Sequence, residues 1–356
     1  MATSAYRLLI LSTPVGPLGS GLGGGVELFV KNATQGLQKR GHHITVVAPE
    51  KSVLATCDRL IQISGNPQPT AHTSQRQTPI ILPEPSTLSA MWTYARQVQL
   101  DYDLILHFSY DWLPFYLTPF FQTPIAHFVS MGSLTDAMDA VISQVAEAFP
   151  GTVGMFTRIQ AETFPRSDHY HLLGSAIDIS LYDYCPTPGP ALAWMGRISP
   201  EKGLEDAIAA AQKARTPLKI LGKLENPDYW EDLQKNFPDA PIEYLGFLPT
   251  RDLQAAIRTC RALVMTPKWV EAFGLVAIEA LACGVPVIAY RRGGPVEIVH
   301  SGKTGWLVEP DSVDGLVQAI ERIEELDRAA CRQQAETEFS LDAMAIRYEQ
   351  WFSNIL

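Results

Sequence analysis

Hydrophobic and polar positions along this chain follow two alternating patterns. Short apolar runs, typical of buried strands, are separated by stretches in which apolar residues recur every three or four positions, as on one face of a helix. In the first half the runs lie at residues 8–11, 44–48, 103–108, 125–129, 152–156 and 170–173, and the helical patterns lie at 26–37, 89–99, 134–149 and 158–164. Strands that alternate with helices predict an α/β fold with parallel sheets.

A second alternating series follows residues 183–190, which contain three prolines and one glycine, as linkers often do. Strands are predicted at 191–195, 218–221, 242–245, 262–266, 286–289 and 305–308, and helices at 204–214, 229–237, 251–258, 275–283 and 313–337. We therefore predict two Rossmann-like domains, residues 1–182 and 183–340, that face each other across a cleft. An amphipathic helix within residues 341–356 is expected to pack back on the first domain.

Composition narrows the class of protein. A chain of 356 residues is too long for one typical core, which agrees with two domains. Its net charge of −10 argues against binding to nucleic acid or to anionic lipid. The five cysteines are scattered and form no C-x-x-C pair, and no apolar run is long enough for a membrane span or a signal peptide. We expect a cytoplasmic protein, and its oligomeric state stays open.

The most informative stretch is Glu-Ala-Phe-Gly-Leu-Val-Ala-Ile-Glu at residues 271–279. Glu271 falls in the loop after a predicted strand, Gly274 near a helix start, and Glu279 about one turn into the helix. The unpaired N–H groups of a helix N-terminus attract anions. Two carboxylates placed around such a site suit a nucleotide sugar, one for the sugar and one for the ribose. The alternative is two ordinary carboxylates stabilised by the helix dipole.

A second loop carries two cations, Arg197 and Lys202, after the first strand of the second domain. An arginine fork and a lysine point charge can hold a diphosphate from two sides. The alternative is two solvated side chains without a ligand. The only D-x-D sequence near a predicted strand, Asp101-Tyr-Asp103, precedes the strand rather than following it. We therefore expect no bound metal and no cofactor besides the donor substrate.

The first loop contains Gly19-x-Gly21-x-x-Gly24, which matches the dinucleotide-binding fingerprint, and Glu50 follows the second strand. This match supports an alternative function, an NAD(P)-dependent dehydrogenase. The fingerprint requires its first glycine directly after the strand, however, and residues 12–18 intervene here. We favour a backbone loop that approaches a phosphate or sugar, with Glu27 at the helix start. A mobile surface loop is the other interpretation.

Taken together, the motifs resemble those of retaining nucleotide-sugar glycosyltransferases of the GT-B fold, the glycosyltransferase family 4-like group with an E-x7-E motif. The resemblance covers most of the chain. Its most specific part is residues 271–279 followed by Gly-Val-Pro-Val-Ile at 284–288 and Gly-Gly-x-x-Glu at 293–297. Gly-Gly-Val-Glu at 24–27 and the degenerate segment 172–178 support it.

The resemblance implies a role for each matching position. Glu271 would contact hydroxyls of the donor sugar, Glu279 would bind the ribose, and backbone near Leu248 would read the base. Arg197 and Lys202 would stabilise the departing diphosphate. The implied catalytic residues are Glu271, Arg197, Lys202 and His127. The implied donor-binding residues are Gly24, Gly25, Arg197, Lys202, Leu248, Glu271, Ala272, Phe273, Gly274, Leu275 and Glu279.

The family usually has a histidine after a strand of the first domain, near O6 of the donor sugar. Here His127 is a candidate in a shifted register, Ser130 falls closer to the expected place, and His107 is a third candidate. A core histidine is the alternative for His127. The acceptor is expected to contact Gly23, Glu27, His127 and Ser130.

These expectations describe an enzyme that transfers a hexosyl group, glucose from UDP-glucose, to a small soluble acceptor with retention of configuration. GDP and ADP donors stay open. Residues 19–28 also resemble the glycine-rich loop of cyanobacterial glucosyltransferases that glucosylate tetrahydrobiopterin, which makes a tetrahydropterin one candidate acceptor. Besides the dehydrogenase, the alternatives are a non-catalytic nucleotide-sugar-binding protein and a sugar-nucleotide epimerase.

Overall fold

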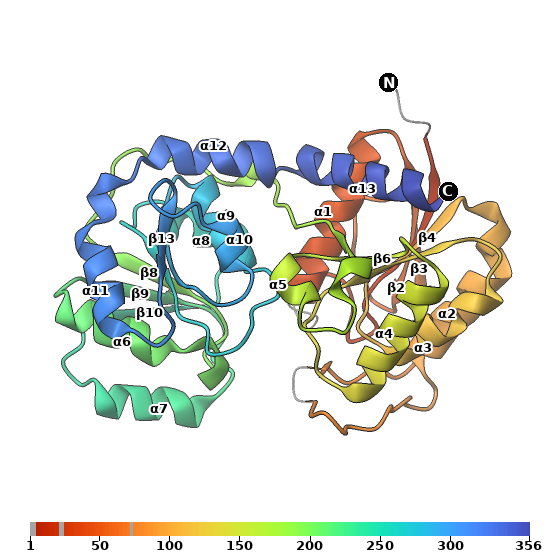
Figure 1. Ribbon diagram of the computed structural model, residues 1–356, viewed down its shortest axis with the longest axis horizontal. Helices are drawn as coiled ribbons and strands as arrows, with labels where there is room; N and C mark the ends of the chain where they lie inside the picture. Colours follow the sequence, from red (N-terminus) through yellow and green to blue (C-terminus); the bar gives the residue numbers. More distant parts are fainter. Residues whose placement is uncertain (1–4, 21–24, 72–73) are drawn as a thin grey trace. The chain divides into compact units, whose positions relative to one another are not determined.

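The chain folds into two compact α/β units, each built around one parallel sheet (Figure 1). The computed structural model describes residues 5–20, 25–71 and 74–356. The first unit comprises Met1–Ala176 and Leu341–Leu356, and the second comprises Ile177–Ser340. The predicted α/β class with parallel sheets is therefore confirmed. None of the helices in the described part of the chain combines the length and apolar character needed to cross a membrane.

The sheet of the first unit has seven parallel strands in the order β3-β2-β1-β4-β5-β6-β7. Its strands are β1 (Arg7–Leu11), β2 (His43–Pro49), β3 (Arg59–Ile63), β4 (Leu104–His107), β5 (Ile125–Val129), β6 (Val153–Met155) and β7 (His171–Leu172). The central strands are almost entirely buried, as expected when helices cover both faces of a parallel sheet.

Helices cover both faces of this sheet. They are α1 (Gly25–Lys39), α2 (Thr87–Val98), α3 (Trp112–Leu117), α4 (Asp136–Ala148), α5 (Arg158–Ala161) and α13 (Leu341–Ile355). On one face α2 to α4 pack on the strands through two apolar clusters. On the other, α13 lies beside α1, where Phe29 of α1 and Tyr348 of α13 both meet the ring of Phe128 (Figure 1). The segment 341–356 thus completes the first unit.

The contacts of α13 are polar as well as apolar. Arg40, just after α1, forms ion pairs with Glu349 at 2.7 Å and with Asp342 at 2.8 Å. The indole N–H of Trp351 donates to the carbonyl oxygen of Gly151 at 2.6 Å. Arg347 donates to the carbonyl oxygen of Leu173 at 2.7 Å. These side chains fix α13 to three separate parts of the first unit.

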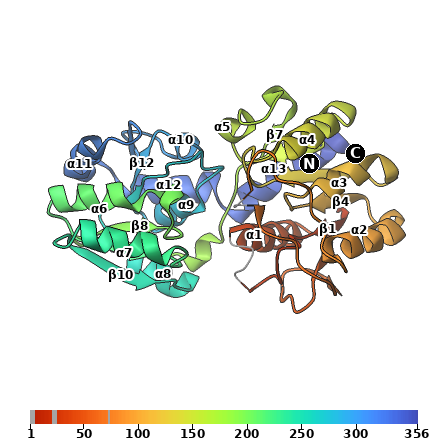
Figure 2. The same cartoon turned by 90° about the horizontal axis from the view of Figure 1, so that it is seen from below.

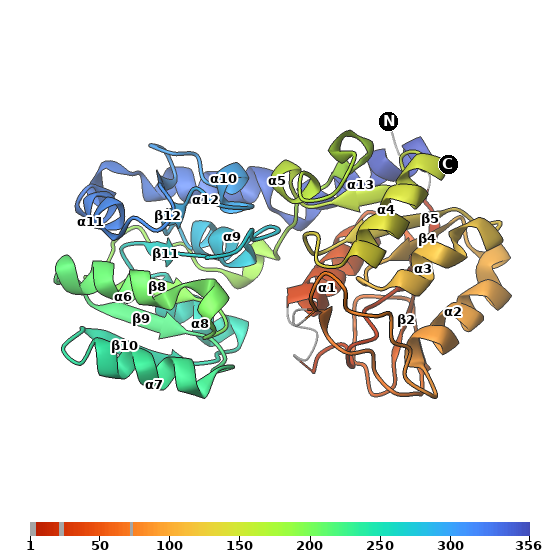
Figure 3. The same ribbon diagram turned by 60° about the horizontal axis from the view of Figure 1, so that its bottom comes forward.

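The sheet of the second unit has six parallel strands in the order β10-β9-β8-β11-β12-β13, which Figure 3 shows for β10 to β12. Its strands are β8 (Leu192–Met195), β9 (Leu218–Leu221), β10 (Ile242–Gly246), β11 (Leu263–Met265), β12 (Val287–Tyr290) and β13 (Gly305–Val308). Its helices are α6 (Leu204–Lys213), α7 (Pro227–Asn236), α8 (Thr250–Ile257), α9 (Leu275–Ala282), α10 (Pro295–Ile298), α11 (Val313–Glu321) and α12 (Arg328–Glu338).

These helices form two groups. On one face α6 packs beside α11, and both share an apolar cluster with the sheet (Figure 2). The second group brings α9 into contact with α8 and α12. Short polar side chains start several of the helices by accepting a backbone N–H, a cap worth about 1 kcal/mol each. These caps are Asn226 for α7, Ser312 for α11 and Asp327 for α12.

The structure differs from the sequence-based prediction in four elements. Strand β3 was missed because it is a half-exposed edge strand whose polar residues, at the first and fourth of its five positions, break up the apolar run. The short helices α3 and α10 were also missed. The predicted helix 313–337 is two helices, because residues 323–325 form a 3-10 turn and Asp327 caps a new helix.

The strand orders place a switch point in each sheet. In the second unit β8 and β11 are neighbours, and the chain runs outward from them in opposite directions. In doubly wound folds, ligands bind outside the carboxyl ends of the strands at this point. The loop after β8 carries Arg197 and Lys202, and the loop after β11 carries Glu271. The topology therefore brings the two predicted motifs of this unit to one place.

Candidate functional site

Lys202 and Glu271 meet at the switch point of the second unit. The ammonium nitrogen of Lys202 donates to Oε2 of Glu271 at 2.5 Å. Their side chains are only 19% and 17% exposed, so the pair is shielded from most of the solvent that would weaken it. A cation and a carboxylate from two strand-end loops, 69 positions apart in sequence, thus form one polar centre.

The carboxylate of Glu271 stays ionised despite its burial. Burial alone would raise the pKa of Glu271, but the charge of Lys202, its hydrogen bond and the indole N–H of Trp269 together lower it. Trp269 donates to the same Oε2 at 3.2 Å. A carboxylate whose charged form is stabilised in this way can bind hydroxyl groups strongly.

Arg197 lies in the same loop as Lys202 and is paired on both sides. Its Nη1 atom lies 2.7 Å from Oε2 of Glu225, and its Nη2 atom lies 3.0 Å from Oε1 of Glu201. The arginine side chain is 29% exposed. An anion that binds this guanidinium has to compete with carboxylates that already hold it.

Glu279 is buried in α9, where its side chain receives a hydrogen bond of 2.8 Å from the hydroxyl of Tyr182. The residue is 7% exposed. Burial raises the pKa of Glu279 to about 7, although the hydrogen bond from Tyr182 works in the opposite direction. Burial and the nearby Glu279 charge raise the pKa of the Tyr182 hydroxyl, which therefore stays a donor. Sequence reasoning did not identify Tyr182, because 97 positions separate it from Glu279.

Glycines hold the loop that joins Glu271 to α9. Gly274, which precedes the helix, has φ of 102°, a backbone conformation that side chains rarely allow. Gly294 donates its N–H to the carbonyl oxygen of Glu271 at 2.6 Å. A Cβ atom on Gly294 would lie 2.2 Å from the carbonyl oxygen of Phe273. The backbone of segment 293–294 therefore packs directly on the loop of Glu271.

The remaining predicted donor-binding residues of the second unit surround this centre in the chain. Ala272 is partly exposed and Phe273 is buried, and both belong to the same loop as Glu271. Leu275 is partly buried and begins α9. Leu248 is partly buried and follows β10 by two residues, next to the strongly exposed Phe247. Loops after β8, β10 and β11 therefore carry all the predicted residues of this unit except those in α9.

In the first unit, the carboxylate of Glu27 in α1 forms hydrogen bonds within the protein. It accepts the backbone N–H of Gly19 at 2.8 Å and the hydroxyl of Ser20 at 3.2 Å. These bonds hold the described part of the first loop against α1. Gly25 is the exposed first residue of α1, whereas Gly23 and Gly24 lie outside the described residues.

His127 lies inside the sheet of the first unit, in β5, and both of its ring nitrogens have protein partners. Its Nδ1 atom lies 2.9 Å from Nδ1 of His107, and its Nε2 atom lies 2.9 Å from the hydroxyl of Thr118. His107 continues to the hydroxyl of Ser109 at 2.6 Å. Burial lowers the pKa of His127 to about 3 and also lowers the pKa of His107. The structure thus places both histidines in the core, and Ser130 is the partly exposed residue after β5.

The two histidines belong to a continuous hydrogen-bonded chain. Two neutral imidazoles can share an Nδ1 to Nδ1 bond only if one donates and the other accepts. Ser109 extends the chain to the carboxyl group of Asp111, whose pKa burial raises to about 6. This chain leads from the core to the loop after β4, at the switch point between β1 and β4.

The dinucleotide fingerprint fits the described structure poorly. β1 ends at Leu11, and Gly19 therefore does not form the tight turn that follows the strand in a dinucleotide site. Gly21 and Gly24 lie outside the described residues. Glu50 is exposed, in the turn after β2.

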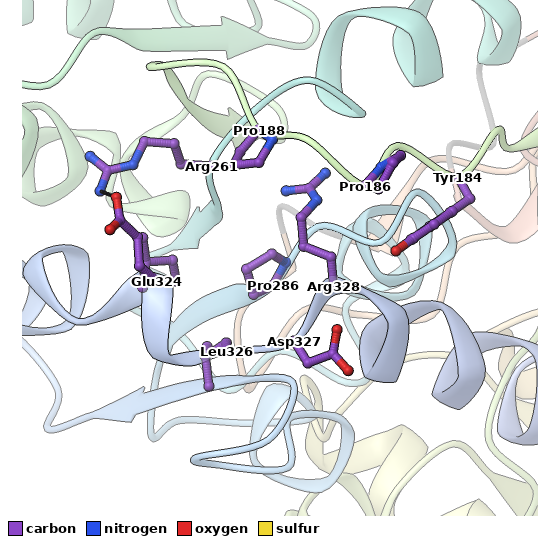
Figure 4. Close-up of a pocket in the computed structure, with 10 residues that line it drawn as sticks. Tyr184, Pro186, Pro188, Arg261, Pro286, Glu324, Leu326, Asp327 and Arg328 are labelled. Atoms are coloured by element: carbon purple, nitrogen blue, oxygen red, sulfur yellow. Dashed lines mark hydrogen bonds and ion pairs between the residues drawn. The ribbon is translucent and has the colours of Figure 1, made fainter.

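A cavity of about 280 Å³ lies near the amino ends of strands of the second sheet, whereas the Lys202–Glu271 pair lies beyond their carboxyl ends (Figure 4). Its walls include Arg261 and Pro286, which come just before β11 and β12. The guanidinium of Arg328 borders it and donates to three backbone carbonyls, those of Cys185, Arg258 and Cys260. The cavity contains none of the predicted site residues, so it is separate from the Lys202–Glu271 centre.

Comparison with known proteins agrees with the geometry of the second unit. Residues 186–338 match the family model described as glycosyl transferases group 1. Over 157 residues the chain is 36% identical to glycogen synthase of Mycobacterium tuberculosis, a match that covers 42% of this chain and 37% of the relative. The chain therefore spans well under half the length of this curated relative.

Two further comparisons extend over nearly the whole chain. D-inositol 3-phosphate glycosyltransferase of Corynebacterium aurimucosum is 24% identical and matches 89% of this chain and 87% of its own length. The structure of HepE from Anabaena in complex with UDP superposes with a TM-score of 0.76 at 17% identity, covering 98% of this chain and all of HepE. The fold is thus that of GT-B glycosyltransferases, as predicted.

Proposed function

We propose that the chain is a retaining, metal-independent hexosyltransferase that moves glucose from UDP-glucose to a small soluble acceptor in the cytoplasm. The observation that carries this proposal is the Lys202–Glu271 pair at the switch point of a unit that matches the group 1 family. In this proposal the second unit binds the donor and the first unit binds the acceptor. A tetrahydropterin is the acceptor to test first.

The site residues divide the work on the donor. The N-terminus of α9 and the cations Arg197 and Lys202 bind the diphosphate. Glu271 accepts hydrogen bonds from sugar hydroxyls, and Glu279 accepts them from the ribose. Lys202 and Arg197 are paired with carboxylates, so these pairs have to open when the donor binds. The diphosphate then replaces the carboxylates as the partner of both cations, and sugar hydroxyls replace the ammonium group as the partner of Glu271.

The proposed reaction is a front-face displacement. The bond between the anomeric carbon and the diphosphate oxygen breaks, and the acceptor oxygen forms a new bond on the same face. The acceptor proton passes to an oxygen of the departing diphosphate. Electrostatic stabilisation of that leaving group is the main contribution expected from Arg197 and Lys202.

The role of His127 has to be revised within this proposal. Both of its ring nitrogens are engaged in the core of the first unit, so the sugar contact is assigned to Ser130 instead. HepE was also solved in complex with UDP-glucose, which makes this donor the first to test here.

A thermal-shift panel tests the donor class. UDP, GDP, ADP, UDP-glucose and NADH are each added with and without EDTA. A ligand at one hundred times its dissociation constant stabilises by about 2.7 kcal/mol, which raises the melting temperature by a few degrees. We expect a shift with UDP and UDP-glucose that survives EDTA. A shift with NADH alone would favour the dehydrogenase, and loss of the UDP shift in EDTA would overturn metal independence.

Turnover separates glucosyl transfer from binding alone and from epimerisation. Release of UDP from UDP-glucose in the presence of a tetrahydropterin would support transfer. Tight binding of UDP without release of UDP across an acceptor panel would favour a non-catalytic binding protein. Conversion of the donor to an isomeric sugar nucleotide without any acceptor would favour an epimerase.

A further inference from the structure

Trp269 contacts both members of the Lys202–Glu271 pair. Its indole N–H lies 3.2 Å from Oε2 of Glu271, the same oxygen that Lys202 approaches at 2.5 Å. The ammonium nitrogen of Lys202 also lies 4.8 Å from the centroid of the indole ring. Each of the three side chains therefore touches the other two.

The backbone on either side of Trp269 is anchored. The N–H of Lys268 donates to the carbonyl oxygen of Glu201 at 2.9 Å, which ties this loop to the loop of Lys202. Arg292 donates to the carbonyl oxygen of Pro267 at 2.8 Å and forms an ion pair with Asp311 at 2.8 Å. Because its neighbours are held, the half-buried indole keeps its direction toward Glu271.

The contacts of the indole with Glu271 and with Lys202 can persist when a donor substrate binds. When a diphosphate takes Lys202, Glu271 loses the cation that keeps it ionised in a buried place. An indole N–H is an uncharged donor that does not titrate, so it can continue to hold the carboxylate. The face of the same ring attracts the ammonium of Lys202 from a fixed direction.

We propose that Trp269 is a positioning residue of the donor site, which orients Glu271 for the sugar and Lys202 for the diphosphate at the same time. This inference rests on the proposed function for the identity of the donor substrate. The contacts among Trp269, Lys202 and Glu271 do not depend on that function. Trp269 itself needs no contact with the donor to play this role.

Three variants separate the two contributions of the indole. Trp269→Phe keeps an aromatic face for Lys202 and removes the N–H, and we expect kcat/KM for UDP-glucose to fall about tenfold or more, as for loss of a hydrogen bond to a charged group. Trp269→Leu removes the face too and lowers it about twofold to fivefold further. The matched control is Trp306→Phe, because the Trp306 ring also contacts a cation, Arg322, whereas its N–H has no partner in the described structure. We expect this control to stay within twofold of the wild type.

A pH profile distinguishes positioning from simple loss of packing. Removal of the N–H raises the pKa of Glu271, so the acid limb of kcat/KM should move to higher pH in Trp269→Phe but not in Trp306→Phe. Unchanged kcat/KM and an unchanged acid limb in Trp269→Phe, with an active wild type, would overturn the inference.

The indole N–H also gives a signal that needs no substrate. We expect the ¹H–¹⁵N resonance of Trp269, assigned by its absence in Trp269→Phe, to shift in Glu271→Gln and in Lys202→Ala without any nucleotide. A resonance that ignores both substitutions would overturn the inference. A protein that shows these shifts but neither binds UDP nor turns over UDP-glucose would retain the contact and disprove the proposed function instead.

Discussion

The hydroxyl of Tyr182 donates a 2.8 Å hydrogen bond to the buried carboxyl group of Glu279. This bond fixes a group whose pKa is raised to about 7, so Glu279 changes charge close to neutral pH. The folded protein therefore holds a proton at Glu279 between about pH 4.5 and 7 that the unfolded chain has lost. Its stability contribution is greatest in acid and falls as the pH rises through 7.

Glu279→Gln should therefore stabilise the second unit at pH 8. Gln keeps an acceptor for Tyr182 and removes the buried charge, and we expect a gain of about 3 kcal/mol at pH 8 that disappears below about pH 4.5. Urea unfolding across this range measures it, with the exposed Glu231→Gln as control. Parallel stability curves for the variant and the wild type would contradict the prediction. The same variant should bind UDP-glucose more weakly, because its ribose contact loses the charge.

Lys202→Ala should lower kcat for glucosyl transfer by about 10² to 10³, the scale for removal of one preorganised group that stabilises developing charge. The control is Lys213→Ala, an exposed lysine of α6 that pairs with Asp314 on the surface. Steady-state release of UDP measures both variants. An unchanged kcat in Lys202→Ala would rule out this role for the lysine.

The core histidines of the first unit should make it sensitive to acid. Because burial lowers the pKa of His107 and His127 below 6.5, the unfolded chain binds protons that the folded unit does not. The stability of the unit is full above pH 6.5 and falls as the pH drops toward 3, by about 1.4 kcal/mol per pH unit for each histidine. His127→Gln should make this slope shallower, because about one proton fewer is taken up when the unit unfolds.

Urea unfolding at several values between pH 4 and 7 measures the slope. His43→Gln, at a histidine whose side chain is 73% exposed, is the control and should leave the slope unchanged. NMR titration gives an independent check, since the ring of His127 should stay neutral well below pH 6. A ring that titrates near pH 6.5 would show that His127 is accessible to solvent.

Gly294→Ala should disturb the loop of Glu271. The new methyl group would lie 2.2 Å from the carbonyl oxygen of Phe273, so the loop has to move, at a cost of about 1–3 kcal/mol in stability. We expect donor affinity and kcat to fall at least tenfold. Gly132→Ala is a matched control, because its methyl group would meet nothing closer than 3.4 Å. Equal effects of the two substitutions would contradict the steric argument.

The sequence predicted the fold class and most elements, because alternating apolar runs and helical periods report burial on a parallel sheet. The elements it missed carry weak versions of these patterns. β3 is an edge strand, and α3 and α10 are too short to show a helical period. The break between α11 and α12 was missed because Asp327 looks like any other acidic residue in the sequence. Only the structure shows that its side chain caps a backbone N–H at the start of α12.

The candidate site was predictable where its residues lie close together in one motif, as Glu271, Gly274 and Glu279 do. Partners from distant segments were not predictable. Tyr182 reaches Glu279 only because the chain folds back across 97 positions. Trp269 lies only two positions before Glu271, and this proximity was a signal in the sequence. Spacing in a loop does not reveal, however, where a side chain points.

The helix α13 has a consequence for the order in which the protein can be made. The first unit needs residues 341–356 to cover Phe128 and to pair with Arg40, and these residues follow the whole of the second unit in the chain. During synthesis the first sheet therefore emerges early, but the part of its face beside α1 that α13 covers stays exposed until α13 is made, while Ile177–Ser340 can close its own core. A translation stop before α13 would leave a finished second unit joined to an incomplete first one, a natural target for chaperones and proteases.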